Sequence, residues 1–191
     1  MSQTNKYTQL NNGIKMPRLG LGVYKAQEGS EVENAVKFAL AHGYRLIDTA
    51  SFYENETGVG KAIKQSGVPR EEIFVTTKVW NDMLGYEETL AAFEDSRKKL
   101  DLEYIDLYLI HWPVPGKFKD AWKAMEKLYK EGAVRAIGVC NFNIHHLEEL
   151  FESCEIKPAV NQVEFHPLLV QKDLLQFCKD NNIQMEAWAP I

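Results

Sequence analysis

Four ionisable side chains lie at or just beyond the ends of apolar runs that have the length of β-strands: Asp48, Tyr53, Lys78 and His111. The carboxyl ends of the strands in a parallel barrel all meet on one face, so such residues converge on one pocket. A carboxylate, a phenol, an ammonium group and an imidazole in one pocket are suited to proton donation by the phenol. This set is the strongest indication of chemistry in the chain.

Each of the four residues also has an ordinary structural interpretation. Asp48 could cap the helix that follows its strand, which is a common use of aspartate. Tyr53 could be a half-buried loop aromatic, Lys78 a solvated charge and His111 a structural hydrogen-bonding residue. Because all four residues lie at strand ends in one chain, a shared site is favoured over four unrelated roles.

The composition is typical of one globular domain. The 191 residues are 45% apolar and 26% charged, which allows a sizeable core in a single domain over residues 1–191. The net charge of -5, with lysines spread along the chain, disfavours nucleic acid or an anionic membrane as a partner. Residues 1–10 lack the apolar stretch of a signal peptide, and no run reaches transmembrane length. We therefore predict a cytoplasmic protein, and the polar helix faces predict a monomer.

The cysteines and histidines do not indicate a metal centre. The three cysteines are sparse and form no C-x-x-C pair, which fits a reduced protein without structural zinc. No grouping of histidines with acidic residues completes a ligand set. We predict no metal site.

Short strand-like runs alternate with helical patterns along the chain. The strands are expected at residues 19–24, 46–49, 73–79, 105–111, 134–139, 160–165 and 184–188. The clearest helical stripe runs from Phe118 to Tyr129 and is followed by Gly132, a usual helix terminator. Ser30-x-x-Glu33 predicts a capping box at the start of the first helix.

Seven strands alternating with six helices predict an α/β fold, a (β/α)8 TIM barrel. Asn11-Asn12-Gly13 between two apolar segments predicts an N-terminal β-hairpin that closes the bottom of the barrel. The competing doubly wound fold requires G-x-G-x-x-G for a dinucleotide. The segments Gly20-Leu21-Gly22 and Gly58-Val59-Gly60 both lack the third glycine.

Six motifs, in order along the chain, resemble those of the aldo-keto reductases. They are Ile47-Asp48-Thr49-Ala50, Tyr53-x-Asn55-Glu56, Thr77-Lys78, Leu109-Ile110-His111-Trp112-Pro113, Gly138-Val139-x-Asn141-Phe142 and Asn161-Gln162-x-Glu164-x-His166-Pro167. Within the family, the chain is most similar to bacterial glyoxal or methylglyoxal reductases and 2,5-diketo-D-gluconate reductases. The resemblance implies an NADP-dependent oxidoreductase that reduces small aldehydes and ketones with NADPH.

The four ionisable residues suit this reaction. Reduction of a carbonyl needs a hydride donor, which no side chain supplies, and an acid for the developing alkoxide. The reference pKa of tyrosine is about 10, and a nearby ammonium group lowers it. We therefore expect Lys78 to lower the pKa of Tyr53, Asp48 to hold Lys78, and His111 to orient the carbonyl oxygen. The resemblance implies the same roles.

The resemblance also implies a set of cofactor-binding residues. Asn141 and Gln162 would bind the nicotinamide carboxamide, Trp188 would stack on the ring, and Cys140 and Asp48 would complete the site. Cys140 stands where the family usually has serine, and Trp188 where it usually has tyrosine. Asn141 could instead cap the helix expected at 144–151. A buried polar residue such as Gln162 in a strand is harder to explain without a ligand.

Three aromatic residues that follow strands match family positions at the barrel mouth: Tyr24, Trp80 and Trp112. Their alternative role is core packing. An apolar wall with few polar groups suits small aldehydes and dicarbonyls.

A barrel of this type has eight strands and typically about 250 residues. We expect the seventh helix, the eighth strand and the eighth helix to be absent from this chain. It would then belong to a longer enzyme, which we favour, or be an inactive fragment. A nicotinamide-binding regulatory protein and a hydrolase with metal-activated water are the alternatives of a different class.

Overall fold

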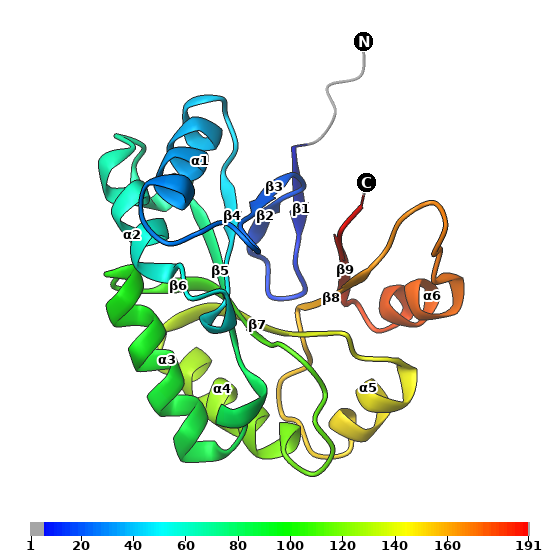
Figure 1. Cartoon of the computed structure of the whole chain (residues 1–191). Coiled ribbons are helices and arrows are strands. Elements are labelled where there is room, and N and C mark those ends of the chain that lie inside the picture. Colours follow the sequence, from blue (N-terminus) through cyan, green and yellow to red (C-terminus); the bar gives the residue numbers. More distant parts are fainter. Residues whose placement is uncertain (1–5, 191) are drawn as a thin grey trace.

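Seven parallel strands run in chain order through the main sheet of the computed structural model, which describes residues 6–190 (Figure 1). They are β3 (Gly20–Gly22), β4 (Leu46–Asp48), β5 (Phe74–Val79), β6 (Ile105–Ile110), β7 (Val134–Cys140), β8 (Val160–Glu164) and β9 (Gln184–Trp188). The sheet curves into a nearly closed barrel whose edge strands are β3 and β9. The predicted strands and their parallel arrangement are confirmed.

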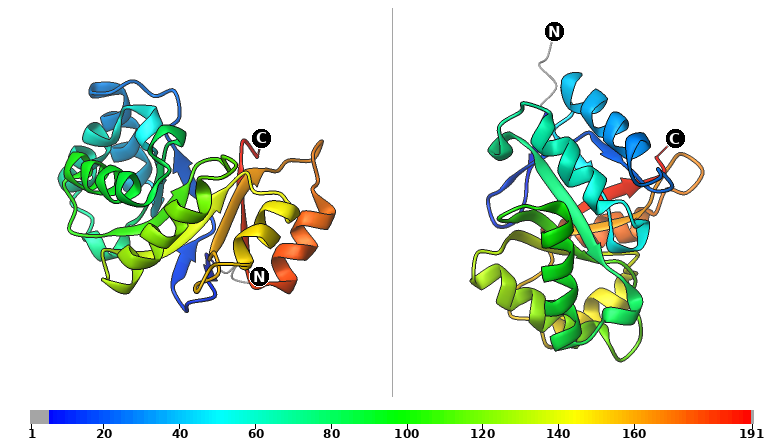
Figure 2. Two further views of the ribbon diagram at one scale, coloured as in Figure 1. Left: turned by 90° about the horizontal axis from the view of Figure 1, so that it is seen from below. Right: turned by 60° about the vertical axis from the view of Figure 1, so that its left-hand side comes forward.

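Helices cover the outer side of this sheet, as the two further views show (Figure 2). They are α1 (Ser30–Ala41), α2 (Glu56–Gln65), α3 (Tyr86–Leu100), α4 (Phe118–Lys130), α5 (Ile144–Phe151) and α6 (Lys172–Asp180). Short 3-10 turns η1 (Ser51–Tyr53), η2 (Arg70–Glu72) and η3 (Asn81–Met83) lie between strands and helices. Because helices shield one face and the barrel interior the other, the central strands are buried on both faces, as the sequence predicts.

Apolar side chains form two separate cores. The larger core lies between the strands and the helices and contains the buried stripe of α4, including Trp122 and Met125. The smaller core fills the lower barrel interior with Leu46, Phe74 and Leu107. The predicted helix end after α4 is confirmed, because Gly132 has a φ of 75° there, which a residue without a Cβ adopts readily.

The hairpin of β1 (Tyr7–Gln9) and β2 (Lys15–Pro17) closes the bottom of the barrel, as predicted. Its residues Leu10 and Met16 are both buried in the interior core. Asn11 Nδ2 donates to Pro158 O at 3.0 Å, just before β8. Asn12 Nδ2 donates to Arg135 O at 2.9 Å, near the start of β7. These contacts hold the hairpin against the amino ends of the strands.

The predicted capping box at the start of α1 is wrong. The helix begins at Ser30 itself, and Gly29 is the N-cap, so Ser30 cannot cap the first turn. The Glu33 carboxylate binds Lys61 on α2 at 2.7 Å instead of turning back to the helix start. A capping box occurs at α5, where Asn143 is the N-cap and its backbone N donates to His146 Nδ1 at 3.1 Å.

A buried acid stabilises the amino ends of the strands. Asp106 on β6 is fully buried and binds Arg70 and Arg135, each at 2.7 Å, and the backbone N of Val75 at 3.0 Å. These bonds satisfy both carboxylate oxygens, which a buried charge requires. Within residues 6–190, no helix has the length and apolar character needed to cross a membrane.

Candidate active site

A buried ion pair joins the ends of β4 and β5. Lys78 Nζ lies 2.5 Å from Asp48 Oδ1 and also donates to Thr49 O at 2.9 Å. Lys78 is fully buried and Asp48 nearly so. Burial acts to lower the pKa of Lys78, but the Asp48 carboxylate and the Tyr53 phenol together raise it above its ordinary value. Lys78 is therefore a fixed cation at neutral pH, and the alternative of a solvated charge is wrong.

The turn η1 places Tyr53 over this ammonium group. Lys78 Nζ is 3.3 Å from Tyr53 Oη, and Ser51 Oγ anchors the turn by donating to Lys78 O at 3.0 Å. Asp48 therefore holds Lys78 instead of capping a helix, since Asn55 is the N-cap of α2.

The pKa of Tyr53 is raised, which differs from the lowering that we expected. Burial of the phenol is the largest effect and raises its pKa, while Lys78 lowers it. Asp48 raises it further because its negative charge opposes that of a phenolate. The Asp48 charge offsets part of the effect of the Lys78 ammonium group. The lowering of the Tyr53 pKa by Lys78 is therefore smaller than the rise caused by burial.

His111 completes the group directly after β6. Its ring lies 5.7 Å from the Tyr53 ring and 5.0 Å from the Trp80 ring, both in edge-on contact. Burial and then the Lys78 charge lower the pKa of His111 to about 3, so the imidazole is neutral at pH 7. Its Nδ1 atom is buried without a hydrogen-bond partner within the described residues. A neutral imidazole has one N–H to donate and one nitrogen that accepts.

The residues expected to bind a cofactor meet on the same face. Gln162 Nε2 donates to Asp48 Oδ2 at 2.8 Å, and Cys140 Sγ lies 3.8 Å from Gln162 Oε1. Asn141 has a φ of 61°, and its Nδ2 donates to His111 O at 3.1 Å. Its Oδ1 accepts from Trp188 Nε1 at 3.0 Å. The capping alternative for Asn141 is wrong, because Asn143 occupies that position.

These residues have hydrogen-bonding capacity left for a carboxamide. Among the described residues, Gln162 Oε1 receives only the weak S–H donor of Cys140, and an amide oxygen accepts two hydrogen bonds. Asn141 Nδ2 retains a second N–H beside the one that it gives to His111 O. The free donor and acceptor therefore match the chemistry of a carboxamide such as that of nicotinamide.

Further aromatic side chains lie beside the rings of Tyr53 and His111. Tyr24 lies 5.0 Å from Tyr53 between ring centres, and Trp80 contacts His111. Trp112 is adjacent to His111 in the chain and is 42% exposed. Phe52 was not predicted, yet it stacks on Trp80 at 3.8 Å and is 47% exposed. Its position directly before Tyr53 could have identified it as a residue near the site.

Glu186 is a second residue that the sequence analysis missed. It lies opposite Gln162 in the pairing of β8 with β9, and its Oε2 atom is buried without a partner within the described residues. The signal was a charged residue in the middle of a strand. Across the described part of the chain, no three His, Cys, Asp or Glu side chains are grouped to hold a metal ion.

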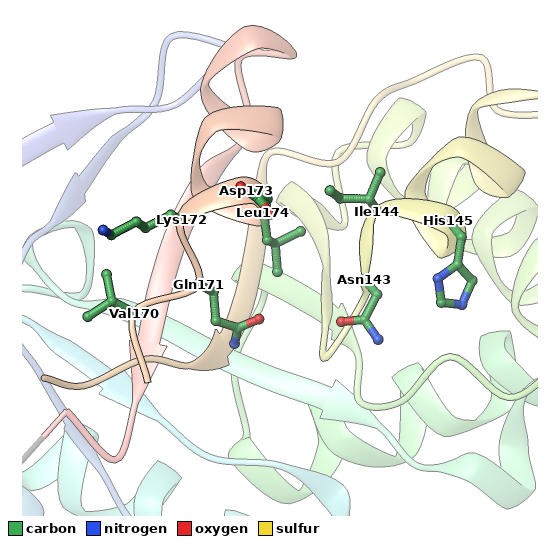
Figure 3. A pocket seen from close by; sticks show the side chains of 8 residues that line it. All are labelled: Asn143, Ile144, His145, Val170, Gln171, Lys172, Asp173 and Leu174. Atoms are coloured by element: carbon green, nitrogen blue, oxygen red, sulfur yellow. The ribbon is translucent and has the colours of Figure 1, made fainter. Parts of the chain in front are cut away.

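A groove of about 550 Å³ lies away from this cluster, at the amino ends of α5 and α6 (Figure 3). Asn143 and His145 line one side, and Gln171, Lys172 and Leu174 the other. It contains none of the predicted site residues.

Comparison with known proteins identifies the family. The aldo/keto reductase family model matches residues 18–191. This chain belongs to the aldo/keto reductase family. The glyoxal reductase of Bacillus subtilis is 61% identical over 183 residues, which cover 96% of this chain and 66% of that protein. The chain thus spans just under two thirds of the length of that relative.

Solved structures show the same fold. The aldo/keto reductase from Brucella melitensis has a TM-score of 0.94 and 48% identity, over 96% of this chain and 72% of that chain. The aldo-keto reductase of Bombyx mori, solved in complex with NADP, has a TM-score of 0.89 and 37% identity, over 96% of this chain and 66% of that chain.

The ion pair generates a first prediction. Asp48→Asn leaves the Lys78 ammonium buried without a counter-charge, so we expect it to lower the free energy of unfolding by about 3 kcal/mol. The double variant Asp48→Asn/Lys78→Met removes the unpaired charge and is expected to recover most of that loss. Urea unfolding followed by circular dichroism measures both values. The pairing would be contradicted if the double variant lost as much stability as the sum of the losses of the two single variants.

The lowered pKa of His111 generates a second prediction. Because protonation sets in only near pH 3, the imidazole carbon-bound protons of His111 should show no titration step between pH 5 and pH 8. NMR spectra across this range, with His111→Asn to assign the signals, make the measurement. A midpoint within the range would show that the ring is more solvated than the structure indicates.

Proposed function

We propose that this protein reduces small aldehydes and ketones, such as glyoxal and methylglyoxal, to alcohols with NADPH, and that Tyr53 donates the proton. The observation that carries the proposal is the position of Lys78 Nζ, 2.5 Å from Asp48 and 3.3 Å from the Tyr53 hydroxyl. Family membership, the glyoxal reductase relative and the NADP complex of a structural neighbour support it. We further propose that the protein acts as a cytoplasmic monomer.

In this proposal NADPH supplies the hydride that reduces the carbonyl carbon. Asn141 and Gln162 would bind its carboxamide through the second N–H of the Asn141 amide and the remaining lone pair of the Gln162 oxygen. Cys140 and Asp48 hold the Gln162 amide by hydrogen bonds. Trp188 would stack on the nicotinamide ring, and its indole is already held by Asn141. Residues that hold both the ring and its carboxamide would fix which face the substrate meets, which lowers the entropic part of the barrier.

The protein residues act on the carbonyl oxygen. The neutral imidazole of His111 donates a hydrogen bond that orients this oxygen and stabilises its developing charge. Tyr53 starts protonated, because its pKa lies above the ordinary value, and gives its proton to the oxygen as the alcohol forms. Lys78 stabilises the phenolate that remains, until solvent returns a proton. Tyr24, Trp80, Trp112 and Phe52 form an apolar wall suited to small carbonyls.

Tyr53→Phe tests the role of the phenol. The variant keeps the aromatic ring and removes only the acid, so we expect NADPH-dependent reduction of methylglyoxal to fall by a factor of at least about 100, with NADPH binding retained. Consumption of NADPH measures turnover, and quenching of tryptophan fluorescence measures binding. Tyr86→Phe, which removes the hydroxyl of an exposed tyrosine at the start of α3, is the matched control.

Turnover by Tyr53→Phe at the wild-type rate would refute the proposed acid. Binding of NADPH by the wild-type protein without turnover of any small carbonyl would instead favour a nicotinamide-binding regulatory protein.

A further inference from the structure

The side chain of Glu186 points into the barrel interior. It lies on β9 between Gln184 and Trp188, and the contacts of these two residues show that their side chains face the barrel interior. Gln184 Oε1 accepts from Thr8 Oγ1 at 2.8 Å at the hairpin floor, and Trp188 Nε1 reaches Asn141 at the mouth. Side chains two residues apart in a strand lie on the same face. Glu186 therefore occupies the interior between the floor and the mouth, in register with Gln162 on β8.

The interior around Glu186 holds two carboxylates for one ammonium group. The charged and titratable groups that face it are Asp48 from β4, Lys78 from β5 and Cys140 from β7. Burial, followed by repulsion from Asp48, raises the pKa of Glu186 to about 7, against the opposing effects of Gln162 and Lys78. Its Oε2 atom is buried and has no partner within residues 6–190.

Gln162 lies between the two carboxylates. One N–H of its amide donates to Asp48 Oδ2 at 2.8 Å. The second N–H can donate a hydrogen bond to a neighbouring carboxylate. The amide of Gln162 lowers the Glu186 pKa, which is the effect of an N–H on an ionised carboxylate. With one N–H given to Asp48 and the other available to Glu186 across the β8–β9 register, the amide oxygen keeps a lone pair beside the weak Cys140 S–H.

We propose that Glu186 is a positioning residue, whose ionised carboxylate acts with Asp48 to hold the Gln162 amide so that its oxygen accepts a hydrogen bond from the nicotinamide carboxamide. This inference rests on the proposed function and adds a residue to it. An ionised Glu186 only accepts hydrogen bonds. A protonated Glu186 also carries an O–H, which competes with the cofactor for the Gln162 oxygen.

The sign of the pH dependence follows from this competition. Above pH 7 Glu186 is ionised and the amide oxygen is free, so NADPH binds more tightly. Below pH 7 the carboxyl is protonated and the affinity falls. Glu186→Gln has the same shape and no charge, and its own N–H can reach the Gln162 oxygen at every pH. It therefore resembles the protonated wild-type protein throughout.

The experiment compares NADPH dissociation constants of the wild-type protein, Glu186→Gln and Glu103→Gln at pH 8.5 and pH 6.0. Fluorescence quenching gives the constants, and thermal unfolding shows that each variant is folded. Glu103 is an exposed residue just before β6, so Glu103→Gln controls for the loss of one negative charge. Ratios to the wild-type value cancel the titration of the cofactor's own phosphates.

We expect Glu186→Gln to bind NADPH about tenfold more weakly than the wild-type protein at pH 8.5, and roughly twofold more weakly at pH 6.0. Glu103→Gln should give a ratio near one at both values. Glu186→Asp keeps a carboxylate and should keep a change of affinity with pH, which makes it the second test if Glu186→Gln does not fold.

A ratio for Glu186→Gln that is the same at both pH values, whether near one or elevated, would overturn the proposal, because a packing role does not titrate. Loss of the pH dependence in Glu186→Asp would overturn it as well. Absence of NADPH binding by the wild-type protein would refute the proposed cofactor itself, and this inference with it.

Discussion

The rest of the site depends on the buried pair of Lys78 and Asp48. An ammonium group without water is costly unless a carboxylate lies beside it, and here the two atoms are 2.5 Å apart. The same pair sets the electrostatics around it. After burial, the Lys78 charge is the second cause of the lowered pKa of His111, and it opposes the raised pKa of Tyr53, while Asp48 binds the amide of Gln162. One ion pair thus links the phenol that we propose as the proton donor, the imidazole of His111 and the amide that we propose binds the cofactor.

The chemistry of the site follows from this balance of charges. Neither Tyr53 nor His111 is ionised at neutral pH, so both side chains have a hydrogen-bond donor to offer. The ammonium group does not make Tyr53 a strong acid in advance. In the proposed reaction its stabilisation is realised when the phenolate forms, which is where stabilisation accelerates a reaction.

Much of the fold was predictable because strand ends can be recognised from the residues alone. An apolar run followed by Asp48, Lys78 or His111 marks both a buried strand and the face on which it ends, so the convergence of these residues needed no coordinates. The pKa of Tyr53 was not predictable, because its sign depends on distances and burial. Glu33 shows a second kind of failure: its partner Lys61 lies on another helix, and local sequence cannot reveal a tertiary competitor. Glu186 became interpretable only once the register of β8 and β9 was known.

The N-terminal hairpin has a consequence for the order of folding. Its side chains donate to the backbone carbonyls of Arg135 and Pro158 and to the side chain of Gln184, so its contacts join residues that are far apart in the sequence. Closing such long loops is entropically unfavourable until the intervening strands are in place. The hairpin is therefore among the last elements to dock, although it precedes all seven strands of the described barrel in the chain, and the barrel interior stays open at its base until those strands have formed.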